Sequence, residues 1–254
     1  LTATSSTQIE DTTYYNLKFS SSSETYVLEG NSTTTNYINI QAGTLDVTTN
    51  NYTLVIGGNW TNSGTFNARS GEVRFNSTSG GNTITTGGSP FYDLVFAGTG
   101  GVWDLQDNAT TSNDITITAG TLDLNGQDLL VQGGDLAVSD VLAADVSSGV
   151  LTIEGTGDIG GSGTTTAYDI TFSGNTTLAG DITAKNNIVI SSSYSLDASS
   201  SNYTITVGGS WDNNGTFTRR QGNVVFNAVS SGKTINDGGW PFYLLTFNGA
   251  GGGW

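Results

Sequence analysis

The sequence predicts an all-β protein built as a right-handed parallel β-solenoid, or β-helix, and three observations lead to this prediction. One tyrosine-bearing phrase occurs four times, at about 76-residue intervals, with its tyrosines at Tyr15, Tyr92, Tyr168 and Tyr243; such spacing indicates a tandem array. Short segments rich in Val, Ile, Thr, Tyr and Phe alternate apolar and polar residues, as strands do. Clusters of Gly, Ser and Asn separate these segments, and no helical period is present.

The first repeat contains eight expected strands, at residues 15–19, 26–28, 38–40, 45–47, 54–56, 65–66, 73–75 and 83–84. Alternate strands lie about 19 residues apart, so four coils of about 19 residues fill one repeat. The spacing predicts one column of stacked residues through Leu54, Val73 and Tyr92. It predicts a second column through Tyr26, Leu45, Phe66, Ile84 and Trp103.

A tandem series of small β-sandwich modules is the alternative fold, because antiparallel sandwiches also have strands spaced by 8–12 residues. The registered repeat favours the solenoid, since like residues at like positions can stack into columns when coils are superposed. Glycine pairs at a fixed position of the repeat, such as Gly57-Gly58 and Gly208-Gly209, are expected at corners where the backbone takes positive φ.

The expected boundaries follow the repeated phrase. Residues 1–14 end a preceding repeat, 15–91 form repeat 1, 92–167 the divergent repeat 2, 168–242 repeat 3, and 243–254 begin a fourth, all in one continuous solenoid. A longer period relates 51–103 to 202–254, where about 30 of 53 positions are identical. Because the sequence stops within a repeat, we expect a window onto a longer polymer or a subunit whose open end docks on another.

The amino-acid composition excludes several classes of function. The chain has 254 residues, no His, no Cys and no Met, which removes the usual general base, the thiol nucleophile and the commonest metal ligand. We therefore expect no enzyme and no cofactor. The net charge of −15 and the seven basic residues argue against nucleic-acid binding, and no apolar run is long enough to insert into a membrane. Lacking easily oxidised sulfur, the chain suits an extracellular or cell-surface location.

Several phrases resemble known repeats. These are Gly57-Gly58-Asn59-Trp60, Gly71-Glu72-Val73-Arg74-Phe75-Asn76, Phe91-Tyr92-Asp93-Leu94-Val95-Phe96 and Ile117-Thr118-Ala119-Gly120-Thr121-Leu122. They are similar to repeats of large secreted prokaryotic surface proteins, which are β-helical in the manner of filamentous haemagglutinin and autotransporter passengers. The resemblance covers nearly the whole chain and implies a cell-surface stalk, sheath or adhesin. It implies no catalytic residue.

Tryptophans are the first candidate binding residues, because an aromatic ring can stack on the apolar face of a sugar. The candidates are Trp60, Trp211, Trp240 and Trp254. Recurrence of Trp60 as Trp211 beside glycine corners is equally consistent with core packing, which we favour. Trp240 replaces Ser89 of the equivalent position and is the one most expected at the surface.

The aspartates of the divergent repeat are weak calcium candidates, since Ca²⁺ binds carboxylate and carbonyl oxygens. Asp135, Asp140 and Asp145 are spaced by five, which matches neither an EF-hand nor the nonapeptide calcium solenoid, so solvated loop positions are the favoured interpretation. Eight Asn-x-Ser/Thr sequons are possible N-glycosylation sites, at Asn31, Asn51, Asn59, Asn76, Asn108, Asn175, Asn202 and Asn214.

The sequence therefore predicts a structural extracellular protein, a repetitive building block of a surface filament, sheath or stalk that associates with itself end to end. The alternative is an adhesin segment that binds surface glycans through exposed aromatic residues.

Overall fold

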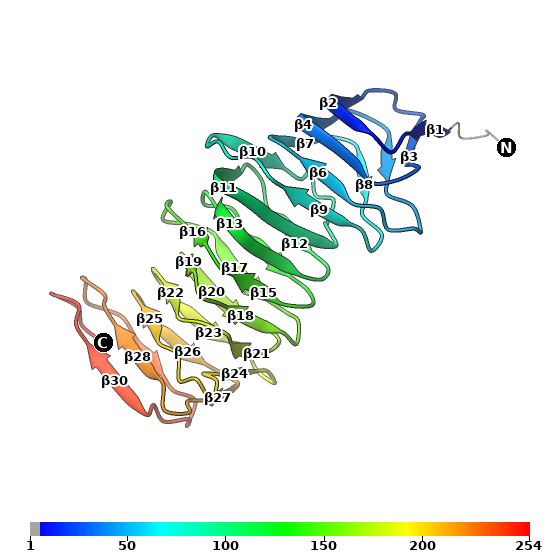
Figure 1. The fold of residues 1–254 in the computed structure, drawn as a ribbon. Coiled ribbons are helices and arrows are strands. Elements are labelled where there is room, and N and C mark those ends of the chain that lie inside the picture. The colour runs from blue at the N-terminus through cyan, green and yellow to red at the C-terminus, as the bar shows by residue number, and fades with distance from the viewer. Residues whose placement is uncertain (1–5) are drawn as a thin grey trace.

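A computed structural model describes residues 6–254 as an elongated β-solenoid of about 12 turns, with the N and C ends at opposite ends of the stack (Figure 1). Every strand pair with a defined register is parallel, and no helix occurs in this part of the chain. The predicted all-β solenoid is confirmed, because antiparallel sandwich modules would require antiparallel pairs. The first five residues of the predicted segment 1–14 lie outside the described residues.

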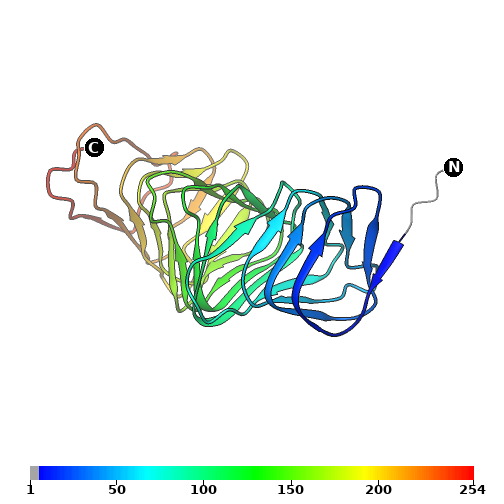
Figure 2. The same ribbon diagram turned by 90° about the horizontal axis from the view of Figure 1, so that it is seen from above.

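Each turn visits three faces, which we call the first, second and third face in chain order, and the turns follow one another along the solenoid (Figure 2). Four long strands bend across the first and second faces: β2 (Thr13–Phe19), β4 (Ser32–Ile40), β11 (Asp93–Leu105) and β13 (Ile115–Asp123). They join these two faces into one 19-stranded sheet.

The remaining strands of that sheet each lie on one face. The first face holds β6 (Leu54–Ile56), β9 (Glu72–Phe75), β15 (Leu136–Val138), β18 (Asp158–Gly160), β21 (Asn175–Leu178), β24 (Ser195–Asp197) and β27 (Thr216–Thr218). The second face holds β7 (Trp60–Asn62), β10 (Asn82–Thr85), β16 (Val141–Ala143), β19 (Thr164–Ala167), β22 (Ile182–Ala184), β25 (Ile205–Val207), β28 (Asn223–Phe226) and β30 (Leu244–Phe247).

The third face is divided into two sheets. Four strands form the N-terminal part, β1 (Ser6–Ile9), β3 (Thr25–Leu28), β5 (Thr44–Asp46) and β8 (Thr65–Asn67). Seven form the other part, β12 (Ala109–Thr111), β14 (Leu129–Val131), β17 (Val150–Ile153), β20 (Asp169–Phe172), β23 (Ile188–Ile190), β26 (Trp211–Asn213) and β29 (Ile235–Asn236).

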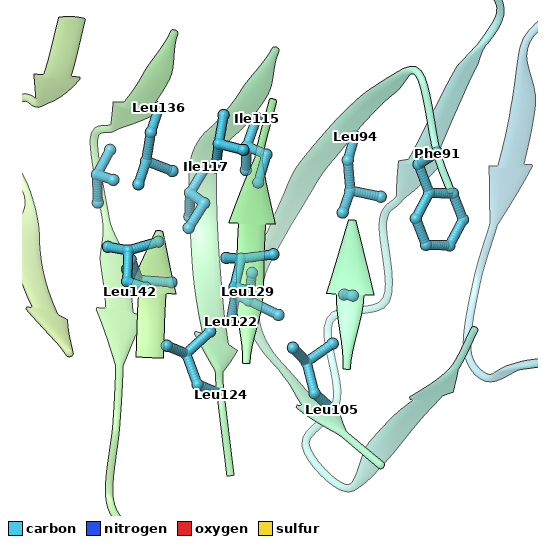
Figure 3. Packing of buried hydrophobic residues seen from close by; sticks show 14 of the residues in the cluster. Phe91, Leu94, Leu105, Ile115, Ile117, Leu122, Leu124, Leu129, Leu136 and Leu142 are labelled. Atoms are coloured by element: carbon cyan, nitrogen blue, oxygen red, sulfur yellow. The ribbon is translucent and has the colours of Figure 1, made fainter. Parts of the chain in front are cut away.

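The core is one continuous cluster of apolar side chains inside the coil. Alternate residues of each strand point inward, so most strands read buried, half-buried, buried, as in β6 and β14. Inward residues of successive turns stack, for example Leu94 on Ile115 and Ile115 on Leu136. Figure 3 shows these side chains converging between the strands. Stacked apolar ladders of this kind supply the buried area that stabilises a solenoid.

The coil length differs from the predicted 19 residues. Turns are about 21 residues long, and register partners range from 17 residues apart, at Thr165 and Ile182, to 24, at Trp60 and Ile84. A spacing of 19 does occur in the first repeat, where Leu54 pairs with Val73, but the corner loops vary in length within the same repeat. Strand spacing within one repeat could not reveal the longer loops.

This difference breaks both predicted columns. Tyr26, Leu45 and Phe66 do stack on the third face. Ile84, however, pairs with Trp60 on the second face, and Val73 pairs with Leu94 instead of Tyr92. The first predicted column is therefore out of register at Tyr92, and the second combines residues of the third and second faces.

One sequence repeat spans a non-integral number of solenoid turns, about three and two-thirds. The repeated phrase lies on the second face at Leu17, the first face at Leu94 and the third face at Ile170. It returns to the second face only at Leu245. Equivalent residues of successive repeats therefore do not stack on one another, and each column is built from non-equivalent repeat positions.

Candidate interaction surfaces

The tryptophans proposed as sugar platforms divide into buried and exposed residues. Trp60 and Trp211 are 1% and 0% exposed, and each makes edge-on or tilted contacts with two phenylalanine rings in the core. Both rings are therefore packed in the core, which is the interpretation that the sequence favoured. Trp254 is half-buried and donates its Nε1–H to the carbonyl oxygen of Gly209 at 3.1 Å. Only Trp240, at 43% exposure, presents a large free surface.

The C-terminal strand β30 exposes apolar residues. Leu244, Leu245 and Phe247 are 51%, 39% and 53% exposed, although Leu245 and Phe247 continue columns that are buried in earlier turns. β30 pairs in register with β28 along one edge and with no other described strand. An apolar strand with one unpaired edge is a surface prone to pair with another chain.

An aromatic and basic patch lies beside this end. Arg219 lies over the ring of Tyr243, with its guanidinium carbon 5.8 Å from the ring centroid, and donates to the carbonyl oxygen of Phe242. Tyr243 is 57% exposed and Trp240 precedes it in the same loop. Exposed aromatic rings with a neighbouring cation can bind the faces of flat or apolar ligands.

A groove of about 410 Å³ opens where the third face is divided, between β8 and the segment leading into β11. Gly87 and Gly88 have φ of 60° and 74°, and Pro90 has no N–H to give to a neighbouring strand. The ladder therefore breaks here. The hydroxyl oxygen of Ser89 accepts hydrogen bonds from the Phe66 N–H and from Asn62 Nδ2, at 3.2 and 3.0 Å, in place of a strand carbonyl.

Two equivalent ion pairs join successive turns. Arg69 binds Asp46 and Arg220 binds Asp197, each with a closest N···O distance of 2.6 Å. Hydrogen bonding from the guanidinium lowers the pKa of Asp46 and of Asp197, and the backbone N–H groups of Thr48 and Ser199 add to the effect. Both arginines have positive φ, so the corner that holds them is built the same way in both copies.

The aspartates of the divergent repeat form hydrogen-bonded ladders between turns. The side chain of Asp93 accepts the Asp114 N–H, Asp114 accepts the Asp135 N–H, and Asp135 accepts the Asp158 N–H. Asp140 instead accepts the Gly120 N–H at 2.6 Å, and the Asp145 N–H donates to Asp123. Asp135, Asp140 and Asp145 thus lie at separate corners. Among residues 6–254, no group of three or more His, Cys, Asp or Glu side chains could hold a metal ion.

Acidic residues also stack on the outer side of the second face. Asp104 and Asp123 are register partners of β11 and β13, and Asp145 lies nearby. Desolvation, followed by the charges of Asp123 and Asp145, raises the pKa of Asp104. Like charges stacked across a ladder repel each other, so this position opposes folding at neutral pH.

The sequon asparagines lie at the surface, where Asn59 is half-buried and the other seven are exposed. The side-chain oxygens of five accept backbone N–H groups from the following turn: Asn31, Asn51, Asn59, Asn108 and Asn202. Asn175 accepts from Ser195. The corner ladders therefore account for much of the asparagine content, and glycosylation at any of the eight stays a prediction.

Two features escaped sequence reasoning. The Asp–Arg pairs recur at the same interval as the longer repeat, so Asp46 and Asp197 could have been matched once Arg69 and Arg220 were aligned. The aspartate ladder required the true turn length, because its members are 21 to 23 residues apart.

Comparison with known proteins finds no matching family model, no matching curated protein and no matching solved structure. The described part of the chain contains no helix long and apolar enough to cross a membrane.

Proposed function

We propose that this chain is a structural, non-catalytic building block of an extracellular filament, sheath or stalk, and that its units associate end to end. The observation that carries the proposal is the continuous stack of about 12 parallel turns around one apolar core. Such a stack is stiff along its axis, because every turn is hydrogen-bonded to its neighbours and buries its side chains between them.

The end contact would be made through β30, on which Leu244, Leu245 and Phe247 are exposed. Burial of these three side chains by another chain would remove apolar surface from water, at about 25 cal/mol per Å². The extracellular location is supported by the resemblance to secreted surface repeats and by the lack of Cys and Met.

Analytical ultracentrifugation and cryo-electron microscopy of the purified chain test this proposal. We expect concentration-dependent rods that lengthen along the solenoid axis, with an axial spacing of about 4.8 Å. Leu245→Asp with Phe247→Asp should leave monomers, whereas Val146→Asp, which changes an exposed apolar residue in a loop of the middle turns, should not. Rods that form equally well in the double variant would refute end contact through β30.

An adhesin that binds glycans is the second candidate, and the patch of Trp240, Tyr243 and Arg219 favours it. Glycan-array binding by the wild type that disappears in Trp240→Ala would support it. Val229→Ala is the matched control, because Val229 is 77% exposed and aliphatic. Equal binding by wild type and Trp240→Ala would rule out sugar recognition by this ring.

A further inference from the structure

The groove on the third face is a gap between two consecutive turns inside the stack. β8 forms one wall, and residues 88–92 of the following turn form the other. The two turns meet on one side of the gap, where the Phe66 N–H donates to Ser89 Oγ at 3.2 Å. They meet again on the other side, where the Asp93 N–H donates to the carbonyl oxygen of Gly71 at 3.4 Å. The gap is therefore a local opening with turns before and after it, and its existence does not depend on either end of the chain.

Two main-chain groups of the β8 wall point into the gap. The C=O and the N–H of one trans peptide group point in opposite directions. The Asn67 carbonyl oxygen accepts the Val47 N–H of the preceding turn, so the Ala68 N–H points across the gap. The Asn67 N–H belongs to the ladder with β5, so the Phe66 C=O points across the gap as well.

Two main-chain groups of the opposite wall point back toward β8. The Phe91 N–H donates to the Thr110 carbonyl oxygen of the next turn at 2.9 Å, so the Pro90 C=O points into the gap. The Phe91 carbonyl oxygen accepts the Ser112 N–H at 2.9 Å, so the Tyr92 N–H points into the gap. Neither these two groups nor the two of β8 have a hydrogen-bond partner among residues 6–254.

The Gly-Gly-x-Pro corner accounts for the gap. In the divergent repeat, the equivalent of Phe66 is Leu142, which pairs in register with Thr165. An undivided ladder of this kind would pair Phe66 with Ser89, and the N–H of residue 90 would donate to the Phe66 carbonyl oxygen. Pro90 has no N–H, so this bond cannot form. Main-chain groups left without a partner need one from water or from a ligand.

The wall after the gap is held in place by the next turn. The Asp107 carboxylate accepts the N–H groups of Thr86 and Gly87, at 2.7 and 2.8 Å. Thr86 Oγ1 donates to the carbonyl oxygen of Asn108 at 2.9 Å and accepts the Gly88 N–H at 3.1 Å. The gap is therefore pre-organised, and a ligand would not have to open it.

A positively charged donor lies at one end of the gap. The Arg69 guanidinium bonds to Asp46 through Nε and Nη2, at 3.0 and 2.6 Å. Its Nη1 has no partner in the described part of the chain, and the side chain is 47% exposed. Arg69 lines the groove together with Tyr92. A carboxylate placed here would form a charge-assisted hydrogen bond with Nη1.

We infer that this gap is an acceptor site for an extended, acidic peptide segment of a partner protein. Successive residues of an extended chain direct their main-chain groups to opposite sides. One residue of the segment bonds to the Phe66 C=O and the Ala68 N–H, and the next bonds to the Pro90 C=O and the Tyr92 N–H. The residue after these places its carboxylate on Arg69.

The spacing of the four main-chain groups favours a peptide over a sugar. On each wall, a C=O and an N–H belong to residues two positions apart, which is the repeat of a parallel ladder. Addition of a strand to a free strand edge is an established mode of peptide binding. The volume of about 410 Å³ lies within the range of ligand pockets, roughly 300–1,000 Å³. A glycan is the competing ligand, because its hydroxyl groups also donate and accept.

The test uses the full chain, labelled with ¹⁵N, and the blocked peptide acetyl-Thr-Ala-Asp-Thr-amide. In the free chain, the Ala68 and Tyr92 amides should exchange with solvent rapidly, and the peptide should shift both signals and slow the exchange. N-methylation of the peptide's alanine removes the donor to the Pro90 C=O and should weaken binding about tenfold. Asparagine in place of the peptide's aspartate should weaken it about three- to tenfold. Protection of both amides in the free chain would overturn the inference.

A tethered peptide guards against weak affinity. Ser112 is exposed and lines the groove, and the chain has no cysteine, so Ser112→Cys gives a unique attachment point. A short flexible linker gives an effective concentration in the millimolar range. We expect the tethered peptide to protect the Ala68 and Tyr92 amides and its N-methylated form to leave them unprotected. Equal exchange with both tethered peptides would overturn the inference.

The two prolines of the chain provide a matched pair of variants. Pro90→Ala supplies the missing N–H, so it should close the gap, slow exchange of the Ala68 amide and abolish peptide binding. Pro241→Ala makes the same change in the other copy of the corner and should leave peptide binding at the gap unchanged. Wild-type binding by Pro90→Ala would refute the assigned site.

Sugars provide the last comparison. Maltotriose and tri-N-acetylchitotriose should leave the Ala68 and Tyr92 signals unchanged. Shifts of these signals with either sugar, and none with the peptides, would assign the gap to glycans and reject the inference. The formation or absence of rods does not affect this result, because the gap lies within the stack.

Discussion

Segments 51–103 and 202–254 are two copies of a repeat, identical at about 30 of 53 positions, in two environments. The first copy lies within the stack and the second at its end. Leu94 and Phe96 are 1% and 0% exposed, whereas the identical residues Leu245 and Phe247 are 39% and 53% exposed. Their contacts with the preceding turn are the same, so the difference comes from the following turn alone. In this fold, pairing with the preceding turn is enough to fix the conformation of a strand. Its apolar side chains are buried only when the following turn covers them.

The two copies also lie on different faces. β11 carries Leu94 on the first face, and β30 carries Leu245 on the second. The aromatic geometry and the Asp–Arg corner are nevertheless repeated. Local sequence therefore determines the shape of a strand and its corner, and the number of residues per turn determines the direction in which they point.

Truncation of the shared phenylalanine should give the largest difference between the copies. Phe96→Ala leaves a cavity between two turns and should lower the free energy of unfolding by about 3–5 kcal/mol. Phe247→Ala removes a ring that is half in water and should cost about 1–2 kcal/mol. Urea unfolding followed by tryptophan fluorescence measures both. Equal losses would mean that the end strand is covered in solution.

Substitution of a shared glycine should affect both copies alike. A Cβ at Gly98 would meet the carbonyl oxygen of Ser77, and one at Gly249 would meet that of Ala228, both in the preceding turn. Gly98→Ala and Gly249→Ala should each cost about 1–3 kcal/mol through overpacking. The same unfolding assay applies. A much smaller loss at Gly249 would show that the last turn shifts freely.

The Gly-Gly-x-Pro corner differs between the copies at its third position, where the first copy has Ser89 and the second has Trp240. Ser89→Ala removes the acceptor of the Phe66 N–H and should cost about 1–2 kcal/mol. Trp240→Ser should leave stability unchanged or raise it by about 0.5–1 kcal/mol, since a hydroxyl could then reach the Phe217 N–H. Thermal unfolding of both variants checks this, and a loss in Trp240→Ser would contradict it.

The sequence was sufficient to predict the class of fold. Tyrosine spacing and period-two alternation predicted stacked parallel turns, and these are present. The positive φ expected at Gly57-Gly58 and Gly208-Gly209 is absent from both pairs. The sequence was insufficient to predict the face on which each strand lies. An error of about two residues per turn placed Ile84 on the third face, whereas it lies on the second. Corner loops carry no periodic signal, so their lengths are known only once strands are paired.

The candidate site residues also divide into those whose role the sequence explained and those whose role it did not. The choice of packing for Trp60 and Trp211 followed from their position beside glycine corners and agrees with their burial. The roles of Asp135 and Asp140 could not be inferred, because each carboxylate bonds to a backbone N–H one turn away. Contacts between turns depend on register, which one strand alone does not define.

The Asp–Arg pairs should show the smallest effect and the same sign in both copies. Asp46 and Asp197 have folded pKa values below the ordinary 3.8 because an arginine bonds to each. Such a group stabilises the fold above its unfolded pKa and loses this contribution as the pH falls through the folded pKa. Asp46→Asn and Asp197→Asn should therefore each cost at most about 1 kcal/mol at pH 7 and almost nothing near pH 2. Urea unfolding of each variant and the wild type across this range measures the difference. Because both aspartates bond to an arginine of the following turn, the loss should be equal in the two copies. A loss of stability that grows as the pH falls would contradict the assigned ion pair.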